Sequence, residues 1–341
     1  MVHKKPDHNS TGDRSDPGKS SPLKAIDLFC GAGGSSQGAR AAGIDVVAGF
    51  DRWSLAGEAH ARNFPEAEFV GGCLEDHNPR ALFSKYGQID LMLASPECTN
   101  HSPAKGGKPR SEESRDTAFQ VVRYAKAFRP RWIVVENVVH MRNWIRDEEF
   151  REGLRRLGYH LSEEVLNAAE FGVPQSRNRL FILADRERRP DAVRPGRHRL
   201  RTAAEIVNLD GRYPWMPLRS EGRAVATLER AERALAEIGP GEPFLIVYYG
   251  SDGAGGWQPL TRPLRTVTTV DRFAVVKPDK ELGHVMRMLQ VPELLAAMGM
   301  PASMKLVGGT RRDRIKMLGN AVCPPVMTAV IDTLTKGAGR K

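Results

Sequence analysis

The sequence predicts an α/β protein with a doubly wound, mostly parallel sheet and a second, smaller, loop-rich domain. From Lys24 to about Asp185, short runs of aliphatic residues alternate with stretches whose apolar residues have helical spacing. Strands that alternate with helices are typical of a parallel sheet covered by helices. After Asp185 the sequence becomes rich in Gly, Pro and Trp, as in YYGSDGAGGWQPLTRPLRT, which favours loops and short strands.

The elements of the first domain can be assigned one by one. Short β-rich runs bounded by turn residues indicate strands, and longer amphipathic stretches indicate helices. The longest helical stretch has apolar residues near helical spacing and stops at Pro130. We expect strands at residues 24–29, 45–51, 89–95, 132–137 and 179–185, and helices at residues 34–43, 54–64 and 114–130.

Four segments are expected along the chain. Residues 1–22 are polar and rich in Pro, Gly and Ser, which predicts a disordered tail without the apolar core of a signal peptide. Residues 23–185 form the first domain, and residues 186–275 the second. Residues 276–336 return to the first domain, with helical patterning from about residue 284 and a loop before the final helix. No apolar run approaches the roughly 18–20 residues of a membrane helix.

Charge and cysteine content narrow the partners and the compartment. The chain of 341 residues has a formal net charge of +10 and a pI of about 9.6, which favours a nucleic-acid partner. An Arg-rich composition can also follow genomic GC content. The four cysteines lie far apart without a paired CxxC, so neither a disulfide framework, a zinc site nor another metal site is expected. Free thiols fit the cytoplasm.

The turn after the first strand, DLFCGAGGSSQG, is rich in glycine. Gly31, Gly33 and Gly34 let the backbone approach a ligand closely at the carboxyl edge of the sheet, where ligands bind in such folds. Asp51 ends the next strand and can bind ribose hydroxyls. Together they suit a nucleoside-containing cofactor, either NAD or S-adenosylmethionine, although many such turns merely reverse the chain.

Three further segments carry candidate catalytic side chains. Cys98 follows a buried strand in a polar loop, where a thiolate would be a strong nucleophile. Glu136 ends a run of valines, and burial there can raise its pKa until it donates a proton; the alternative is a helix cap or an ion pair. Arg177 and Arg179 are two residues apart, which places both on one face of a strand, either at a site or in solvent.

Five segments, taken in order, resemble the hallmark blocks of the DNA (cytosine-5)-methyltransferases of bacteria and phages. They are DLFCGAGG, SPECTNHS, ENV, QSRNR and GNAV. The resemblance covers roughly residues 24–185 and 284–335, and the poorly matching middle lies where this family carries its target-recognition domain. It implies the Rossmann-like fold of the S-adenosyl-L-methionine-dependent methyltransferases.

The resemblance also implies roles for the candidate residues. Cys98 would attack carbon 6 of a flipped-out cytosine, and Glu136 would bind ring N3 and the exocyclic amine. Arg179 would hold the carbonyl oxygen of the base, with Arg177 in support. The cofactor-binding residues would be Phe29, Gly31, Gly33, Gly34, Asp51, Arg52, Leu74, Pro96, Asn320 and Val322.

Two departures from the family pattern are visible. Glu97 stands directly before Cys98, where family members commonly have proline, and a carboxylate there should raise the thiol pKa. Cys73 stands where the family often has an acidic residue, which leaves Leu74 to pack against the adenine.

The expected activity is methylation of duplex DNA at cytosine carbon 5. The alternatives are a methyltransferase that acts on tRNA, a catalytically silent DNA-binding homologue, and a nicotinamide-dependent oxidoreductase. A middle segment of this size favours DNA, since sequence readout needs a surface that enters a groove. We expect a monomer in the cytoplasm with no membrane partner. It would be either an orphan enzyme or the partner of a cognate restriction endonuclease that acts separately. The target sequence cannot be read from the chain.

Overall fold

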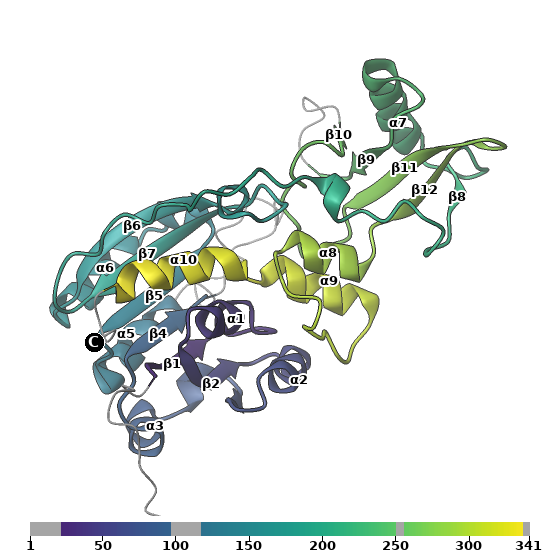
Figure 1. The fold of residues 1–341 in the computed structure, drawn as a ribbon. Helices are drawn as coiled ribbons and strands as arrows, with labels where there is room; N and C mark the ends of the chain where they lie inside the picture. Colours follow the sequence, from purple (N-terminus) through teal and green to yellow (C-terminus); the bar gives the residue numbers. More distant parts are fainter. Residues whose placement is uncertain (1–21, 97–116, 250–255, 337–341) are drawn as a thin grey trace, which may run out of the picture.

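The computed structural model describes residues 22–96, 117–249 and 256–336, and places them in two units, each built on a sheet (Figure 1). The larger sheet has seven strands in the order β3-β2-β1-β4-β5-β7-β6. All neighbours pair in parallel except β7, which is antiparallel to both β5 and β6. The strands are β1 (Lys24–Leu28), β2 (Asp45–Asp51), β3 (Glu68–Gly71), β4 (Leu91–Ala94), β5 (Trp132–Asn137), β6 (His160–Asn167) and β7 (Asn178–Asp185).

Helices cover both faces of this sheet (Figure 1). In β4, Leu91 and Leu93 pack in the core with α1 and α10, whereas Met92 and Ala94 pack with α5 and α6 on the opposite face. A strand buried on both faces reads as a continuous apolar run, which is why LMLA could be assigned from sequence. The helices of this unit are α1 (Gly34–Ala41), α2 (Ser54–Asn63), α3 (Pro79–Tyr86), α5 (Ala118–Phe128), α6 (Asp147–Arg156), α8 (Val291–Ala297), α9 (Arg311–Asn320) and α10 (Pro324–Thr335), with short 3₁₀ turns at Leu74–Asp76, Val139–Asn143, Ala168–Phe171 and Ala203–Glu205.

The predicted fold class is confirmed. Two strands, β2 and β5, begin and end at the residues expected from sequence. β6 was not expected, because its sequence HLSEEVLN is polar and it lies at the edge of the sheet with one open side. The expected tail falls outside the described residues up to residue 21.

The second unit is more regular than the expected loop-rich domain. Its five strands pair antiparallel in the order β10-β9-β11-β12-β8, and α7 packs against β9 and β10. Phe244, Ile246 and Trp257 lie in its small core. The elements are β8 (Met216–Pro217), α7 (Val225–Ile238), β9 (Phe244–Val247), β10 (Trp257–Pro259), β11 (Phe273–Asp279) and β12 (Gly283–Met288).

The boundary expected between residues 275 and 276 is wrong, because it falls inside β11. β11 and β12 form a hairpin that belongs to the second sheet, so this unit extends to Met288. The stretch VMRM, assigned to a helix from its apolar spacing, is strand, and the helix begins only at Val291. A short apolar run is compatible with both helical and strand periodicity, and here the pairing with β11 makes it a strand.

The strand order defines where a ligand can bind. From β1 the chain proceeds to β2 and β3 on one side, and β4 then lies on the other side of β1. The crevice at the carboxyl ends of β1 and β4 is therefore the switch point of the sheet. By length and composition alone, the described segment Arg311–Thr335 could cross a membrane, contrary to the expectation from the sequence. Of its apolar window 61% is buried, as in the core helix of a globular domain.

Candidate active site

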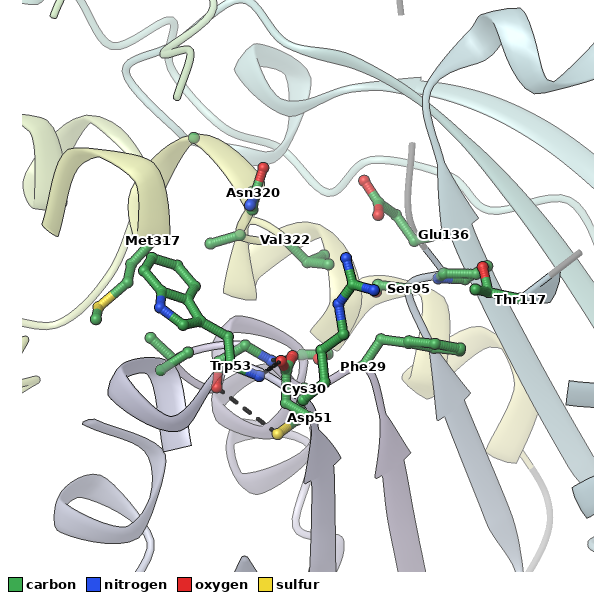
Figure 2. A pocket seen from close by; sticks show the side chains of 18 of the residues that line it. Phe29, Cys30, Asp51, Trp53, Ser95, Thr117, Glu136, Met317, Asn320 and Val322 are labelled. Atoms are coloured by element: carbon green, nitrogen blue, oxygen red, sulfur yellow. Dashed lines mark hydrogen bonds between the residues drawn. The ribbon is translucent and has the colours of Figure 1, made fainter. Parts of the chain in front are cut away.

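A cavity of about 290 Å³ opens at this switch point, and Figure 2 shows side chains that line it. The wall comes from the carboxyl ends of β1, β2, β4 and β5, from the start of β7, and from the end of α9. Segments from both ends of the described chain therefore share one cavity. The predicted residues that the structure brings together there are Phe29, Gly31, Asp51, Arg52, Leu74, Pro96, Glu136, Arg177, Arg179, Asn320 and Val322.

Cys98 and Glu97 lie outside the described residues. Pro96, the last described residue before them, is in the cavity wall. The strand that leads to this segment is β4, which adjoins both β1 and β5.

The glycine-rich turn is fixed by Asp51. One carboxylate oxygen accepts a hydrogen bond from the backbone N–H of Gly31 at 2.8 Å, and the other from that of Trp53 at 2.8 Å. Asp51 thereby ties the turn after β1 to the start of α2. The cavity lies directly against both backbones.

Gly33 and Gly34 do not line the cavity, contrary to the expectation. A Cβ at Gly33 would lie 2.2 Å from the ring of Phe64, and one at Gly34 would lie 2.4 Å from the carbonyl oxygen of Val322. These glycines are needed for close packing inside the protein. Gly31 differs, since a Cβ built there would meet no atom within 4 Å, although its φ of +52° still favours glycine.

A buried polar cluster lies beneath this turn. Asp27 accepts hydrogen bonds from the hydroxyls of Ser35 and Ser36, both at 2.6 Å, and the Ser36 hydroxyl is 3.0 Å from Nε2 of His60. Burial raises the pKa of Asp27 to about 6, against the opposing effect of the serine hydrogen bonds. Burial, aided by Arg40, lowers the pKa of His60 to about 4. Because Ser36 gives its one proton to Asp27, it accepts from a protonated Nε2 of His60.

Glu136 and Arg179 form the charged side of the cavity. Glu136 lies near the end of β5, is 6% exposed, and has its Oε1 3.2 Å from Nε of Arg179 on β7. Burial raises the pKa of Glu136, while Arg179 and then Arg177 act in the opposite direction. A carboxyl with a raised pKa beside an open cavity can donate a proton to a ligand.

Arg177 and Arg179 both line the cavity, whereas their spacing alone left a position at a site or in solvent open. Their guanidinium groups nevertheless have different partners. Arg177 is 2% exposed and donates to the main-chain carbonyls of Val267, Gly319 and Ala321, at 2.8, 2.7 and 3.0 Å. Its contacts therefore connect β7 with two distant segments.

Several residues that line the cavity were not predicted from the sequence. Trp53 directly follows the Asp51–Arg52 pair, and its ring lies 4.4 Å from Nζ of Lys316 on α9. Lys316 and Asn320 are four residues apart and both line the cavity, a helical spacing that was readable in KMLGN but was interpreted as a loop. Met317 lines the cavity beside them (Figure 2).

The described residues fit a nucleoside-containing cofactor. Gly31 borders open space, and the Ser95 hydroxyl is buried in the cavity wall without a hydrogen-bond partner in the described chain. An unpartnered buried hydroxyl calls for a ligand or a water. Trp53 adds an aromatic surface next to the Asp51 carboxylate.

The three described cysteines are free thiols. Cys30 and Cys323 are buried, and burial raises the pKa of Cys323 to about 11, so it is protonated near neutral pH. Cys73 is exposed and lines the cavity beside Leu74. Among the residues that the structure places, no group of three His, Cys, Asp or Glu side chains could hold a metal ion.

The fold and the cavity define a class: a Rossmann-like α/β protein with a cofactor site at the switch point of its sheet. The model of the C-5 cytosine-specific DNA methylases matches residues 23–336. The chain belongs to this family, as the resemblance of its sequence blocks predicted. The methyl donor of the family and its fold is S-adenosyl-L-methionine.

Individual relatives agree with this assignment. The type II methyltransferase M.AgeI of Thalassovita gelatinovora is 31% identical over 168 residues, which cover 47% of this chain and 39% of the relative. M.HindV of Haemophilus influenzae is 30% identical over 161 residues, 47% of this chain and 52% of the relative. The matched part thus spans about half of these relatives' length or less. The DNMT2 of Spodoptera frugiperda, solved as a triple mutant, has the same fold, with a TM-score of 0.67, 17% identity and coverage of 92% and 99% of the two chains.

Proposed function

We propose that this protein transfers a methyl group from S-adenosyl-L-methionine to carbon 5 of cytosine in a specific duplex DNA sequence. The observation that carries the proposal is the shared cavity. One wall has the glycine turn and Asp51, which suit a nucleoside, and the other has the buried Glu136–Arg179 pair, which suits a polar base. Pro96, the last described residue before Cys98 in the sequence, lines the same cavity.

On the base side, the thiolate of Cys98 adds to carbon 6 of the cytosine, and the electron pair of the 5,6 double bond becomes available at carbon 5. Glu136 in its protonated form donates to N3, which offsets the developing negative charge. Arg179 holds both the Glu136 carboxylate and the carbonyl oxygen of the base. After methylation at carbon 5, a solvent water takes the proton from that carbon, the electron pair re-forms the 5,6 double bond, and the sulfur leaves carbon 6 as the thiolate. N3 then returns its proton to Glu136.

On the cofactor side, the chain's own residues bind and orient the donor. S-adenosyl-L-methionine supplies, when bound, a methyl group made electrophilic by its sulfonium sulfur. Asp51 would bind the ribose, Arg52 and Leu74 would pack against the adenine, and Asn320 would line the pocket at the methionine end. Phe29, Gly31, Pro96 and Val322 complete the wall.

The second unit would recognise the DNA sequence. A cytosine inside a duplex cannot reach the cavity, so it must leave the stack at a cost of a few kcal/mol. Residues 186–275, extended to Met288 by the observed hairpin, provide the surface for groove contacts. The net charge of +10 supports phosphate binding. We further propose a cytoplasmic monomer whose cognate endonuclease, where one exists, acts separately.

Labelled-methyl transfer to duplex DNA and to tRNA tests the activity, and bisulfite sequencing of DNA from expressing cells then maps the product. We expect label in DNA that is absent with Cys98→Ala, and 5-methylcytosine in one short recognition sequence. A duplex with 5-fluorocytosine at that position should trap the protein covalently. Methylation of tRNA alone would establish the RNA alternative, and no transfer to either would favour a silent DNA-binding protein.

A further inference from the structure

One piece of the second unit is folded back onto the first. Residues 264–269, between β10 and β11, are here called the docking segment. Leu264 forms backbone hydrogen bonds with Pro174 and Ser176, at 2.9 and 2.8 Å. The backbone N–H of Val267 donates to the side-chain oxygen of the buried Gln175 at 2.8 Å. The docking segment therefore runs alongside residues 174–177, which lead into β7 at the cavity.

Arg177 ties this segment to the cofactor side of the cavity. Its guanidinium donates to Val267 of the docking segment and to Gly319 and Ala321 at the end of α9. Gly319 and Ala321 flank Asn320, which lines the cavity. A guanidinium is planar and permanently charged, and it can hold several carbonyl oxygens in fixed directions, as a lysine ammonium on its flexible stem cannot.

The docking segment and α9 also touch directly. A Cβ at Gly319 would lie 2.4 Å from the carbonyl carbon of Thr268 and 2.4 Å from the backbone nitrogen of Thr269. The two backbones are thus in van der Waals contact where a side chain would separate them. Arg177 and this contact therefore link the end of α9 to the docking segment at two points.

We propose that Arg177 is a positioning residue that couples the cofactor pocket to the second unit, by fixing the end of α9 and the docking segment to one another. This deepens the proposed function and rests on it. Cofactor binding at Asn320 then orders the docking segment, from which β11 of the second sheet continues. By linkage, DNA that orders the second unit raises the affinity for the cofactor.

Hydrogen exchange with S-adenosyl-L-homocysteine as the probe tests this without DNA and without turnover. We expect the probe to slow amide exchange in the docking segment at least about fivefold in the parent protein, a coupling within the usual range. In Arg177→Met this remote protection should disappear, while Gly31 and Trp53 in the cavity wall stay protected. Arg177→Lys keeps the positive charge but lacks the several fixed donors of the guanidinium. We expect it to show remote protection between that of Arg177→Met and that of the parent protein.

Two further variants separate positioning from general stability. Gly319→Ala pushes α9 away from Thr268 with Arg177 unchanged, and we expect it to weaken the remote protection as well. Arg151→Met is the matched control: Arg151 is 11% exposed in its side chain and pairs with Asp147 and Glu163 on the far side of the sheet. It should lower the melting temperature and leave the protection pattern intact.

The outcomes are distinguishable. A parent protein that binds the probe without protecting the docking segment would overturn the coupling, as would full remote protection in both Arg177→Lys and Gly319→Ala. Failure of the parent to bind the probe at all would instead count against the proposed function.

Discussion

Two buried glutamate–arginine pairs, one between β5 and β7 of the larger sheet and one between β12 and α8, differ in how completely the carboxylate is bound. Glu293 at the start of α8 accepts two hydrogen bonds from Arg287 on β12, at 2.6 and 2.8 Å, and two from the backbone N–H groups of Gln290 and Asn208. Glu136 has, among the described residues, a single ion pair to Arg179 at 3.2 Å.

This difference fits a structural role for Glu293 and the ligand-binding role proposed for Glu136. Glu293 and Arg287 are 4% and 3% exposed, and all acceptor capacity of the carboxylate points at protein donors. Glu136 is nearly as buried but borders the cavity, with capacity left for a ligand. A buried carboxyl that is incompletely bound is costly to keep, and such groups concentrate at active sites.

The largest expected effect is on catalysis. Glu136→Ala should lower kcat about 10⁴-fold, equivalent to about 5.5 kcal/mol, because the proton donor to the base is lost. The free energy of unfolding should change little, since the wild-type carboxyl is buried with few partners. Labelled-methyl transfer measures kcat, and urea unfolding measures the free energy of unfolding. If Glu136→Ala lowered the free energy of unfolding as much as Glu293→Ala does, the distinction between the two pairs would be wrong.

For the Glu293–Arg287 pair we expect a large effect on stability and a small effect on catalysis. Glu293→Ala should lower the free energy of unfolding by about 3–5 kcal/mol, because it leaves Arg287 buried without its counter-charge. Below its melting temperature the variant should keep most of its kcat. The control is Glu232→Ala, since Glu232 pairs with Arg219 at 3.0 Å in an exposed position and should contribute under about 1 kcal/mol.

In the buried cluster at Asp27, two titratable groups change the pH dependence of stability in opposite directions. Asp27 titrates at about 6 when folded, above its unfolded value, so its contribution to stability is present below about pH 4 and is lost as the pH rises to 6. His60 titrates at about 4 when folded, so its contribution is present above about pH 6.5 and is lost as the pH falls to 4. Each amounts to about 3 kcal/mol with opposite sign, and they nearly cancel.

Single substitutions should reveal the separate contributions of Asp27 and His60 to the pH dependence of the free energy of unfolding. Asp27→Asn should make the free energy of unfolding rise from pH 4 to 6.5 more steeply than in the parent, and His60→Gln should make it fall. Urea titrations at four pH values would measure both slopes. If the two single variants kept the parent's pH profile, the assigned titrations of Asp27 and His60 would be wrong.

How much the sequence predicted depended on the range of the interactions involved. β2 and β5 could be placed to the residue, because strands buried on both faces appear as unbroken apolar runs. The β11–β12 hairpin could not be placed, since KPDKELGH is polar and the sheet is defined only by pairing across distant strands.

The same limit applied within the site. Glu136 and Asp51 were found from local patterns and Asn320 from the family resemblance, and the structure brings them to one cavity. The partners of Arg177 were not foreseeable, because they lie 90 to 144 residues away in the sequence. Gly34 was expected beside a ligand, but a side chain is excluded there by the carbonyl of Val322. This contact could not be predicted from the residues near Gly34 in the sequence.

That contact between Gly34 and Val322 also bears on how the protein is made on the ribosome. The glycine turn emerges early, yet the wall that closes over it, from Lys316 to Val322, is synthesised nearly three hundred residues later. A nascent chain that ends before Lys316 lacks this wall of the cavity. The proposed cofactor site is therefore complete only after Val322 has been synthesised.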